Sequence, residues 1–407
     1  MAGRVLIITD PTLLVRHANE RLVMVRDKKQ VAAMPVADIS HVSLYGPVTM
    51  TGAAIASLLD TGVEVTLYSS HGRYRGAITS ADPKNVYLLL AQVAAWKDDK
   101  VRLGFARPVV VGKIGGQREL VQRRAIDRAS AACDRVAAQL RVFEARARES
   151  DDVQELRGIE GAASAAYFGV FGEMLSSQWT FPGRVRRPPT DPVNALLSLG
   201  YTVAVGEVSQ VLTRAGFDTR IGLLHGIRYG RESLPLDLVE ELRAPMVDRF
   251  VLRMLNRGQI KPEAFEVREG GAVRLTPEGL RTFFELWEEM MAGRAPGEWG
   301  ELEGGEEPEV VGREEGQRGE RETVTWRRRI EEQVGRLRRY IMNGTPYEPV
   351  RVRSTKKGGK DSPAGGEASN PKKGLTKVAD RGRKKDATRV PGWGSGRVLG
   401  KRFSEAV

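Results

Sequence analysis

Residues 85–99 read NVYLLLAQVAAWKDD, and the periodicity of the chain changes at this stretch. Upstream of it, short runs rich in Val, Ile, Leu and Tyr are separated by polar turns, which is typical of β-strands. Only TGAAIASLLDTG, residues 51–62, interrupts these runs with a helical pattern. Downstream, apolar residues recur at spacings of three and four, which predicts helices.

We therefore predict an α+β fold with three parts. Residues 1–90 form a small β-sandwich-like domain with one short helix, and residues 91–350 form a larger all-α domain. Residues 351–407 form a basic, disordered tail with 16 Lys or Arg against 5 Asp or Glu, whereas residues 1–350 hold 48 basic and 47 acidic residues. The formal net charge of +12 thus comes almost entirely from a tail that is suited to binding a polyanion.

Within the α-domain, residues 105–116, FARPVVVGKIGG, indicate a connector, and residues 117–149 indicate one long amphipathic helix. Asp191 followed by Pro192 is a start signal for a further helix. Residues 300–322 hold nine Glu against three Arg, which predicts a solvated acidic loop.

A basic helix follows this loop, at residues 326–341. Its apolar positions should dock on the protein, which leaves arginines such as Arg327 and Arg336 for solvent or a phosphate backbone.

The single cysteine, Cys133, excludes an internal disulfide and an all-cysteine metal site. No apolar run approaches the roughly 18 to 20 residues that span a bilayer, and the N-terminus lacks a secretory signal pattern. We expect a cytoplasmic protein with no membrane partner.

The stretch GLLHGIRYGRESLPLDLVEEL, residues 222–242, combines acids with a leucine-rich helical pattern. Asp237 lies three residues before Glu240 and four before Glu241, so all three side chains point to one face of a helix, where like charges repel. A divalent cation would remove this conflict. Alternatively, the acids complement the dipole of the first helical turns, and His225 is a structural histidine.

A third acid lies in RGIEGAASAAYFGVFGEM, at the head of a helix made mostly of Gly, Ala and Ser. Such a helix lets neighbouring helices approach closely, and the carboxylate of Glu160 is then costly to bury unless a charge or a metal compensates it. An ordinary exposed Glu near a helix N-terminus is the alternative.

Three blocks, GIEGAASAAYF, DPVNALLSLGY and GLLHGIRYGRESLPLDLVEELRAPMVD, in this order resemble signature blocks of the CRISPR-associated protein 1 family, the integrase of CRISPR adaptation. The resemblance covers about residues 4–350 and includes the order of β-domain and helical domain. It implies that Glu160, His225 and Glu240 are catalytic and bind a Mg²⁺ or Mn²⁺ ion. Asp237 would be an alternative ligand or a support for the ligands.

The resemblance also implies the reaction: a metal-dependent DNA endonuclease and integrase that inserts short foreign DNA fragments as new spacers into a CRISPR array by 3′-hydroxyl transesterification. Its partners would be double-stranded DNA (spacer fragment and CRISPR repeat), a second copy of the chain in a homodimer formed through the β-domain, and CRISPR-associated protein 2. Arg231, Arg243 and Asn194 would contact DNA, with a salt bridge to the neighbouring acids as the alternative for the two arginines.

Two other functions stay open at this point. A stand-alone metal-dependent nuclease acting on branched DNA or RNA would use the same ligands, and dependence on a 3′-hydroxyl donor would separate it from an integrase. A DNA-binding scaffold would have a structural or lost metal site.

Overall fold

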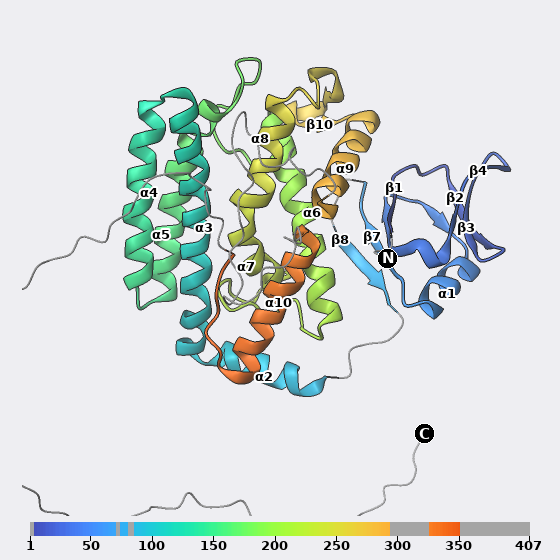
Figure 1. Ribbon diagram of the computed structural model, residues 1–407, viewed down its shortest axis with the longest axis horizontal. Coiled ribbons are helices and arrows are strands. Elements are labelled where there is room, and N and C mark those ends of the chain that lie inside the picture. Colours follow the sequence, from blue (N-terminus) through green and yellow to red (C-terminus); the bar gives the residue numbers. More distant parts are fainter. Residues whose placement is uncertain (1–3, 71–73, 80–84, 294–324, 351–407) are drawn as a thin grey trace, which may run out of the picture. The chain divides into compact units, whose positions relative to one another are not determined.

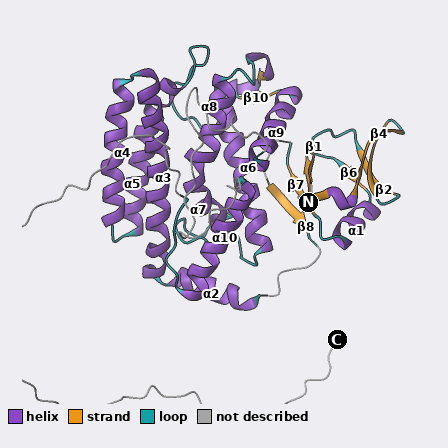
Figure 2. Ribbon diagram, viewed as in Figure 1, coloured by secondary structure: helices purple, strands orange, loops and turns teal. Residues whose placement is uncertain are grey.

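The computed structural model describes residues 4–70, 74–79, 85–293 and 325–350 (Figures 1 and 2). The predicted acidic loop, 300–322, and the predicted tail, 351–407, lie outside these residues. Strands fill the chain up to Ile78 and helices dominate from Val86 onward, which confirms the predicted α+β fold class.

Two four-stranded sheets make up the first part of the chain, in the orders β1-β5-β7-β8 and β4-β3-β2-β6. In the first sheet β1, β5 and β7 are parallel and β8 is antiparallel; in the second, β2, β3 and β4 form an antiparallel meander and β6 joins β2 in parallel. The elements are β1 (Arg4–Ile8), β2 (Leu14–Ala18), β3 (Arg21–Arg26), β4 (Lys29–Pro35), η1 (Val36–Asp38), β5 (Ile39–Tyr45), β6 (Thr49–Met50), α1 (Gly52–Asp60), β7 (Glu64–Tyr68) and β8 (Tyr74–Ile78).

The core of this part draws on both sheets and on the predicted helix. Val15, Leu22, Val42 and Leu58 are completely buried in one apolar cluster. Leu22 and Met24 of β3, and Val42 and Leu44 of β5, contribute to this cluster from alternating positions, as expected for sheets with one buried face.

The rest of the described chain is mainly helical. Its elements are α2 (Val86–Lys97), α3 (Asp99–Arg128), α4 (Ala131–Glu149), α5 (Val153–Gly169), η2 (Phe171–Met174), α6 (Pro192–Arg214), α7 (Ser233–Leu242), the π-helical segment η3 (Arg243–Asp248), α8 (Arg249–Asn256), η4 (Pro262–Ala264), β9 (Phe265–Val267), η5 (Glu269–Gly271), β10 (Val273–Leu275), α9 (Pro277–Ala292) and α10 (Trp326–Asn343). Asp191 caps α6 by accepting a hydrogen bond from the backbone N–H of Asn194, as the start signal predicts.

The prediction of a connector at 105–116 was wrong, because α3 continues through it with Pro108 inside the helix. The glycines of this stretch serve close packing: a Cβ on Gly112 would lie 2.7 Å from the Cβ of Pro349. The single helix predicted at 117–149 was also wrong, since α3 ends at Arg128, its C-cap Ala129 has a φ of +50°, and Ser130 caps α4.

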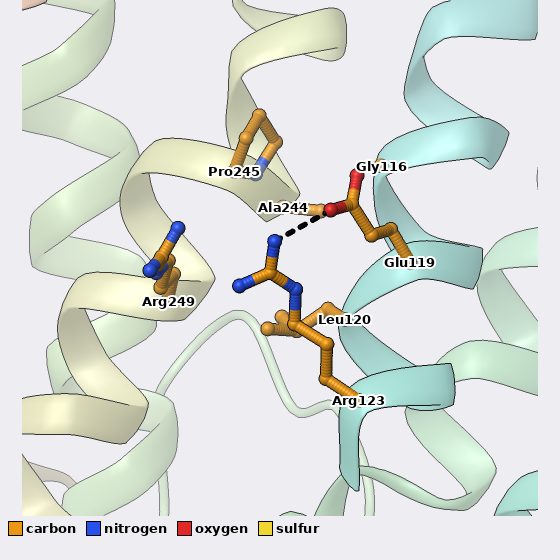
Figure 3. Close-up of a pocket in the computed structure, with 7 residues that line it drawn as sticks. All are labelled: Gly116, Glu119, Leu120, Arg123, Ala244, Pro245 and Arg249. Atoms are coloured by element: carbon orange, nitrogen blue, oxygen red, sulfur yellow. Dashed lines mark hydrogen bonds and ion pairs between the residues drawn. The ribbon is translucent and has the colours of Figure 1, made fainter. Parts of the chain in front are cut away.

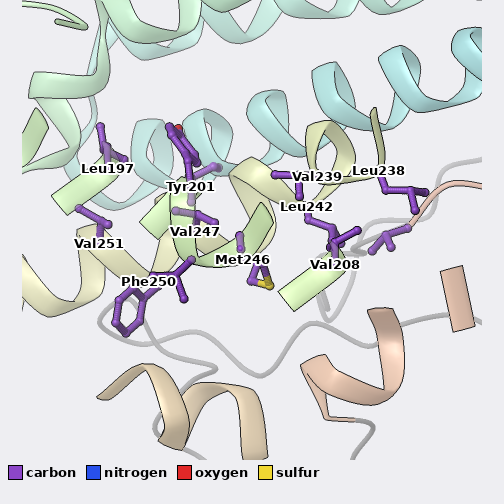
Figure 4. Packing of buried hydrophobic residues seen from close by; sticks show 14 of the residues in the cluster. Leu197, Tyr201, Val208, Leu238, Val239, Leu242, Met246, Val247, Phe250 and Val251 are labelled. Atoms are coloured by element: carbon purple, nitrogen blue, oxygen red, sulfur yellow. The ribbon is translucent and has the colours of Figure 1, made fainter. Parts of the chain in front are cut away.

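Helices α6, α7, η3 and α8 form the centre of the larger core, with Tyr201, Val208, Leu238, Met246 and Phe250 packed together (Figure 4). Helix α6 is long and apolar enough, by length and composition, to cross a membrane, so the prediction that no segment reaches this threshold was wrong. The most apolar 18-residue stretch of α6 is 67% buried inside the protein, as in the core helix of a folded domain.

Helix α10 docks through its apolar stripe, as predicted: Ile330, Val334 and Leu337 are buried. The prediction that Arg327 faces solvent or phosphate was wrong. Its guanidinium lies 2.7 Å from both carboxylate oxygens of Glu288, and Glu207 also raises its pKa.

Candidate metal centre

The three acids of α7 are all buried, with exposed fractions of 0% for Asp237, 4% for Glu240 and 1% for Glu241. They are therefore not an exposed acidic face that complements the helix dipole. Each of them has a different set of partners, and the partners come from different parts of the chain.

Asp237 holds the segment that carries the histidine. Its Oδ2 accepts the backbone N–H groups of Leu223 (2.6 Å) and Leu224 (2.9 Å), and its Oδ1 accepts the backbone N–H (2.9 Å) and the Nδ1 (2.7 Å) of His225. Because Nδ1 carries a proton and donates a hydrogen bond to this carboxylate, the lone pair of the neutral ring lies on Nε2. Both oxygens of Asp237 are engaged in these bonds, which hold His225 and the two residues before it in place.

Glu240 faces this imidazole. The Nε2 of His225 lies 3.9 Å from Oε1 of Glu240, which also contacts Nη2 of Arg243 at 3.0 Å, while Oε2 accepts a hydrogen bond from Nζ of Lys113 at 2.6 Å. Burial alone raises the pKa of Glu240, but Arg243 and Lys113 outweigh it and lower the pKa to about 2. The side chain is therefore a carboxylate at any physiological pH.

Glu160 reaches the same place from α5, where it lies well inside the helix and not at its head, since α5 begins at Val153. Its Oε1 contacts Nζ of Lys113 and accepts a hydrogen bond from Oγ of Ser164 at 3.0 Å. Its side chain is 26% exposed, close to the 25% of His225, so solvent reaches the site from this side.

The Lys113 ammonium thus lies between the two carboxylates. In the described ranges, no three His, Cys, Asp or Glu side chains stand close enough together to hold a metal ion as they lie. The donor set nevertheless fits a hard divalent cation. Two carboxylates and one oriented imidazole are donor types that bind such ions, and Nε2 of His225 lies 3.9 Å from Oε1 of Glu240.

Glu241 takes no part in this cluster. It accepts hydrogen bonds from Gln333 (2.9 Å), from the hydroxyl of Tyr347 (2.5 Å) and from the backbone N–H of Val350 (2.7 Å). Burial raises its pKa. This side chain fastens α10 and residues 344–350 to α7.

The residues predicted to contact DNA lie in three different settings. Arg243 makes the salt bridge to Glu240 and stacks over the ring of Tyr201, with its Cζ 4.8 Å from the ring centroid. Arg231 lies half-buried in the loop before α7, which also carries the fully exposed Tyr229.

The surroundings of Asn194 contradict the prediction that it contacts DNA. The residue is completely buried, and its amide binds Arg184, Asp191 and the backbone of residues 183 and 185. It organises the segment before α6 and cannot reach DNA.

A small cavity of about 20 Å³ lies between α3 and residues 244–249 (Figure 3). Glu119 pairs with Arg123 there at 2.7 Å, and Arg249 lies across from them. None of the predicted site residues lines this cavity.

Comparisons with known proteins bear on this cluster. A family model described as CRISPR associated protein Cas1 matches residues 6–289, a span that holds Glu160, His225 and Glu240. The chain belongs to this family. A CRISPR-associated endonuclease Cas1 of Rhodospirillum rubrum is 34% identical over 303 residues, which are 71% of this chain and 86% of that protein. One from Thermus thermophilus is 36% identical over 277 residues, 68% of this chain and 83% of the relative.

Solved structures share the fold of this Cas1 chain. A Cas1 protein from Thermotoga maritima superposes with a TM-score of 0.66 at 20% identity and covers 87% of this chain and all of that one. A casposase bound to integration product gives a TM-score of 0.67 at 20% identity, over 85% and 92% of the two chains. A Cas6-RT-Cas1–Cas2 complex gives 0.67 at 24% identity, over 88% of this chain and 36% of the other.

Proposed function

We propose that this Cas1 protein acts in the cytoplasm as a metal-dependent DNA integrase that inserts short DNA fragments as new spacers into a CRISPR array. The observation that supports this most is the convergence of Glu160, Glu240 and an imidazole oriented by Asp237. Carboxylate oxygens suit Mg²⁺, and one imidazole shifts the preference toward Mn²⁺.

Glu160, His225 and Glu240 would hold the ion, which, when bound, polarises the scissile phosphate and stabilises the leaving oxygen. Asp237 keeps Nε2 of His225 aimed at the site through the Nδ1 hydrogen bond. Arg243 adds a fixed positive charge beside Glu240, suited to a phosphodiester as it approaches. The bond to the leaving oxygen breaks as a DNA 3′-hydroxyl attacks the phosphorus.

The partners proposed are double-stranded DNA, a second copy of the chain and the small CRISPR-associated protein 2. Two structures with this fold, a Cas6-RT-Cas1–Cas2 complex and a casposase bound to integration product, support the companion protein and the DNA reaction. The exposed loop with Arg231 and Tyr229 adds a surface beside His225 that suits a phosphate backbone and a base.

A second candidate is a nuclease that hydrolyses DNA or RNA without integration. The name endonuclease carried by the curated relatives favours it. The same ligands serve both reactions, so only the attacking group separates them: water for a nuclease and a DNA 3′-hydroxyl for an integrase.

The deciding experiment is strand transfer of a labelled short duplex into a supercoiled plasmid that carries a CRISPR repeat, with Mn²⁺ or Mg²⁺, with and without the companion protein. We expect joined product with the wild type, and none with His225→Ala, Glu160→Ala or a 3′-dideoxy donor. DNA affinity should survive Glu160→Ala. Nicking that persists with the blocked donor, with no joined product under any condition, would establish the nuclease instead.

A further inference from the structure

Lys113 is an uncommon kind of lysine, because its side chain is only 5% exposed. Its ammonium contacts Glu160 of α5 and, at 2.6 Å, Glu240 of α7, while its own backbone belongs to α3. A buried ammonium is costly unless it is paired with opposite charge, and here two carboxylates from different helices share it.

The charges around this ammonium can be counted from the contacts. Glu160 and Glu240 contribute two negative charges, and Lys113 and Arg243, which contact these carboxylates, contribute two positive ones. These four side chains are therefore electrically balanced without a metal. A divalent cation would leave them with an excess of positive charge, which a DNA phosphate would reduce.

We propose that Lys113 is a resident counter-ion that couples metal loading to DNA binding, an inference that rests on the proposed metal-dependent function. Without metal, the ammonium offsets part of the negative charge of the two carboxylates and holds them together. With a divalent cation held by the same carboxylates, the Lys113 ammonium would turn away from them and pair with a phosphate of the bound DNA. Binding of the metal alone is consequently disfavoured, and binding of the metal together with DNA is favoured.

The test is the affinity of the purified full-length protein for Mn²⁺, followed by the electron paramagnetic resonance of the free ion. It is measured with and without a short duplex whose 3′ ends are dideoxy, so that no joining occurs. Lys113→Met removes the counter-ion, Lys113→Gln keeps a polar group of similar length, and Lys100→Met removes an exposed lysine of the same helix as a control.

Without DNA, Lys113→Met should bind Mn²⁺ at least about tenfold more tightly than the wild type, because no ammonium opposes the cation. DNA should tighten Mn²⁺ binding in the wild type by more than it does in the variant. The metal-free variant should also melt several degrees lower, whereas Lys100→Met should match the wild type throughout. If Lys113→Met does not fold, Lys113→Gln should show the same direction of change.

Unchanged or weaker Mn²⁺ binding by both Lys113 variants would overturn the counter-ion role, as would an unaltered effect of DNA. This outcome leaves the metal centre intact if the wild type still binds Mn²⁺ in a way that Glu160→Ala and His225→Ala abolish. If the wild type shows no such binding, the proposed metal centre and the role of Lys113 both fail.

Discussion

Replacing Asp237 by Asn should lower the free energy of unfolding by about 3 to 6 kcal/mol. The carboxylate accepts four hydrogen bonds, two at each oxygen, at 2.6–2.9 Å. An Asn side chain keeps one acceptor oxygen, so two of the four bonds are lost, each with a charged acceptor and each worth about 1.5 to 3 kcal/mol. The amide NH₂ that replaces the other oxygen faces donors, which adds to the cost.

Urea unfolding of the metal-free protein, followed by circular dichroism, measures this change. Asp99→Asn is a matched control, because Asp99 is 92% exposed and makes one ion pair with Arg102, so its loss should cost less than about 0.5 kcal/mol. A second readout is metal affinity, which should fall by about 10- to 100-fold as His225 loses its orienting partner. An Asp237→Asn protein within 1 kcal/mol of the wild type would refute the argument that this carboxylate organises residues 222–225.

Three other perturbations test different parts of the structure. Burial raises the pKa of Asp248 from 3.8 to about 6, so between these two pH values the folded state keeps a proton that the unfolded state releases. The free energy of unfolding should therefore fall by about 3 kcal/mol as pH rises from about 4 to 6. Urea titrations at several pH values measure this slope, which Asp248→Asn should remove. Glu241→Ala leaves the Tyr347 hydroxyl and the Val350 N–H without their acceptor and should cost about 2 kcal/mol or more, with faster amide exchange in residues 344–350. Unchanged exchange there would contradict the anchoring role. Gly222→Ala places a Cβ 2.7 Å from the Cβ of Ser233 and should lower the free energy of unfolding in urea by about 1 to 3 kcal/mol. Gly226→Ala is the control, because the nearest atom to its Cβ would be 3.9 Å away, and it should be close to neutral.

Sequence patterns predict most of the helical elements because start signals and apolar spacing are local. The Asp191–Pro192 signal fixes the start of α6, and the apolar stripe of the last helix predicts its buried face. The stretch 105–116 misleads for the same reason. Its glycines and Pro108 disfavour a helix locally, yet close packing against Pro349 and Pro245 makes small residues necessary there.

Because of that error, Lys113 was not among the predicted site residues. A lysine in a connector is read as solvated, whereas the same lysine on a buried helix has to be paired. A prediction of α3 as one continuous helix, with Phe105, Val109, Val110 and Ile114 at helical spacing, would have placed Lys113 beside its buried face.

The burial of Asn194 could not be predicted either. The residues that satisfy its amide, at positions 183–185, precede α6 in an irregular segment whose path the sequence does not specify.

The hydrogen bond from Val350 to Glu241 has a practical consequence for anyone who handles this protein. The backbone of Val350 is thus fastened to the residue adjacent to Glu240. A force transmitted to Val350, from a surface-bound tag, an optical trap or a fused domain, would act first on helix α7 and on the carboxylate next to the candidate metal ligand. Immobilisation through the N-terminus would leave that helix unloaded, and comparing the two attachments would show how far tension at one end alters strand transfer.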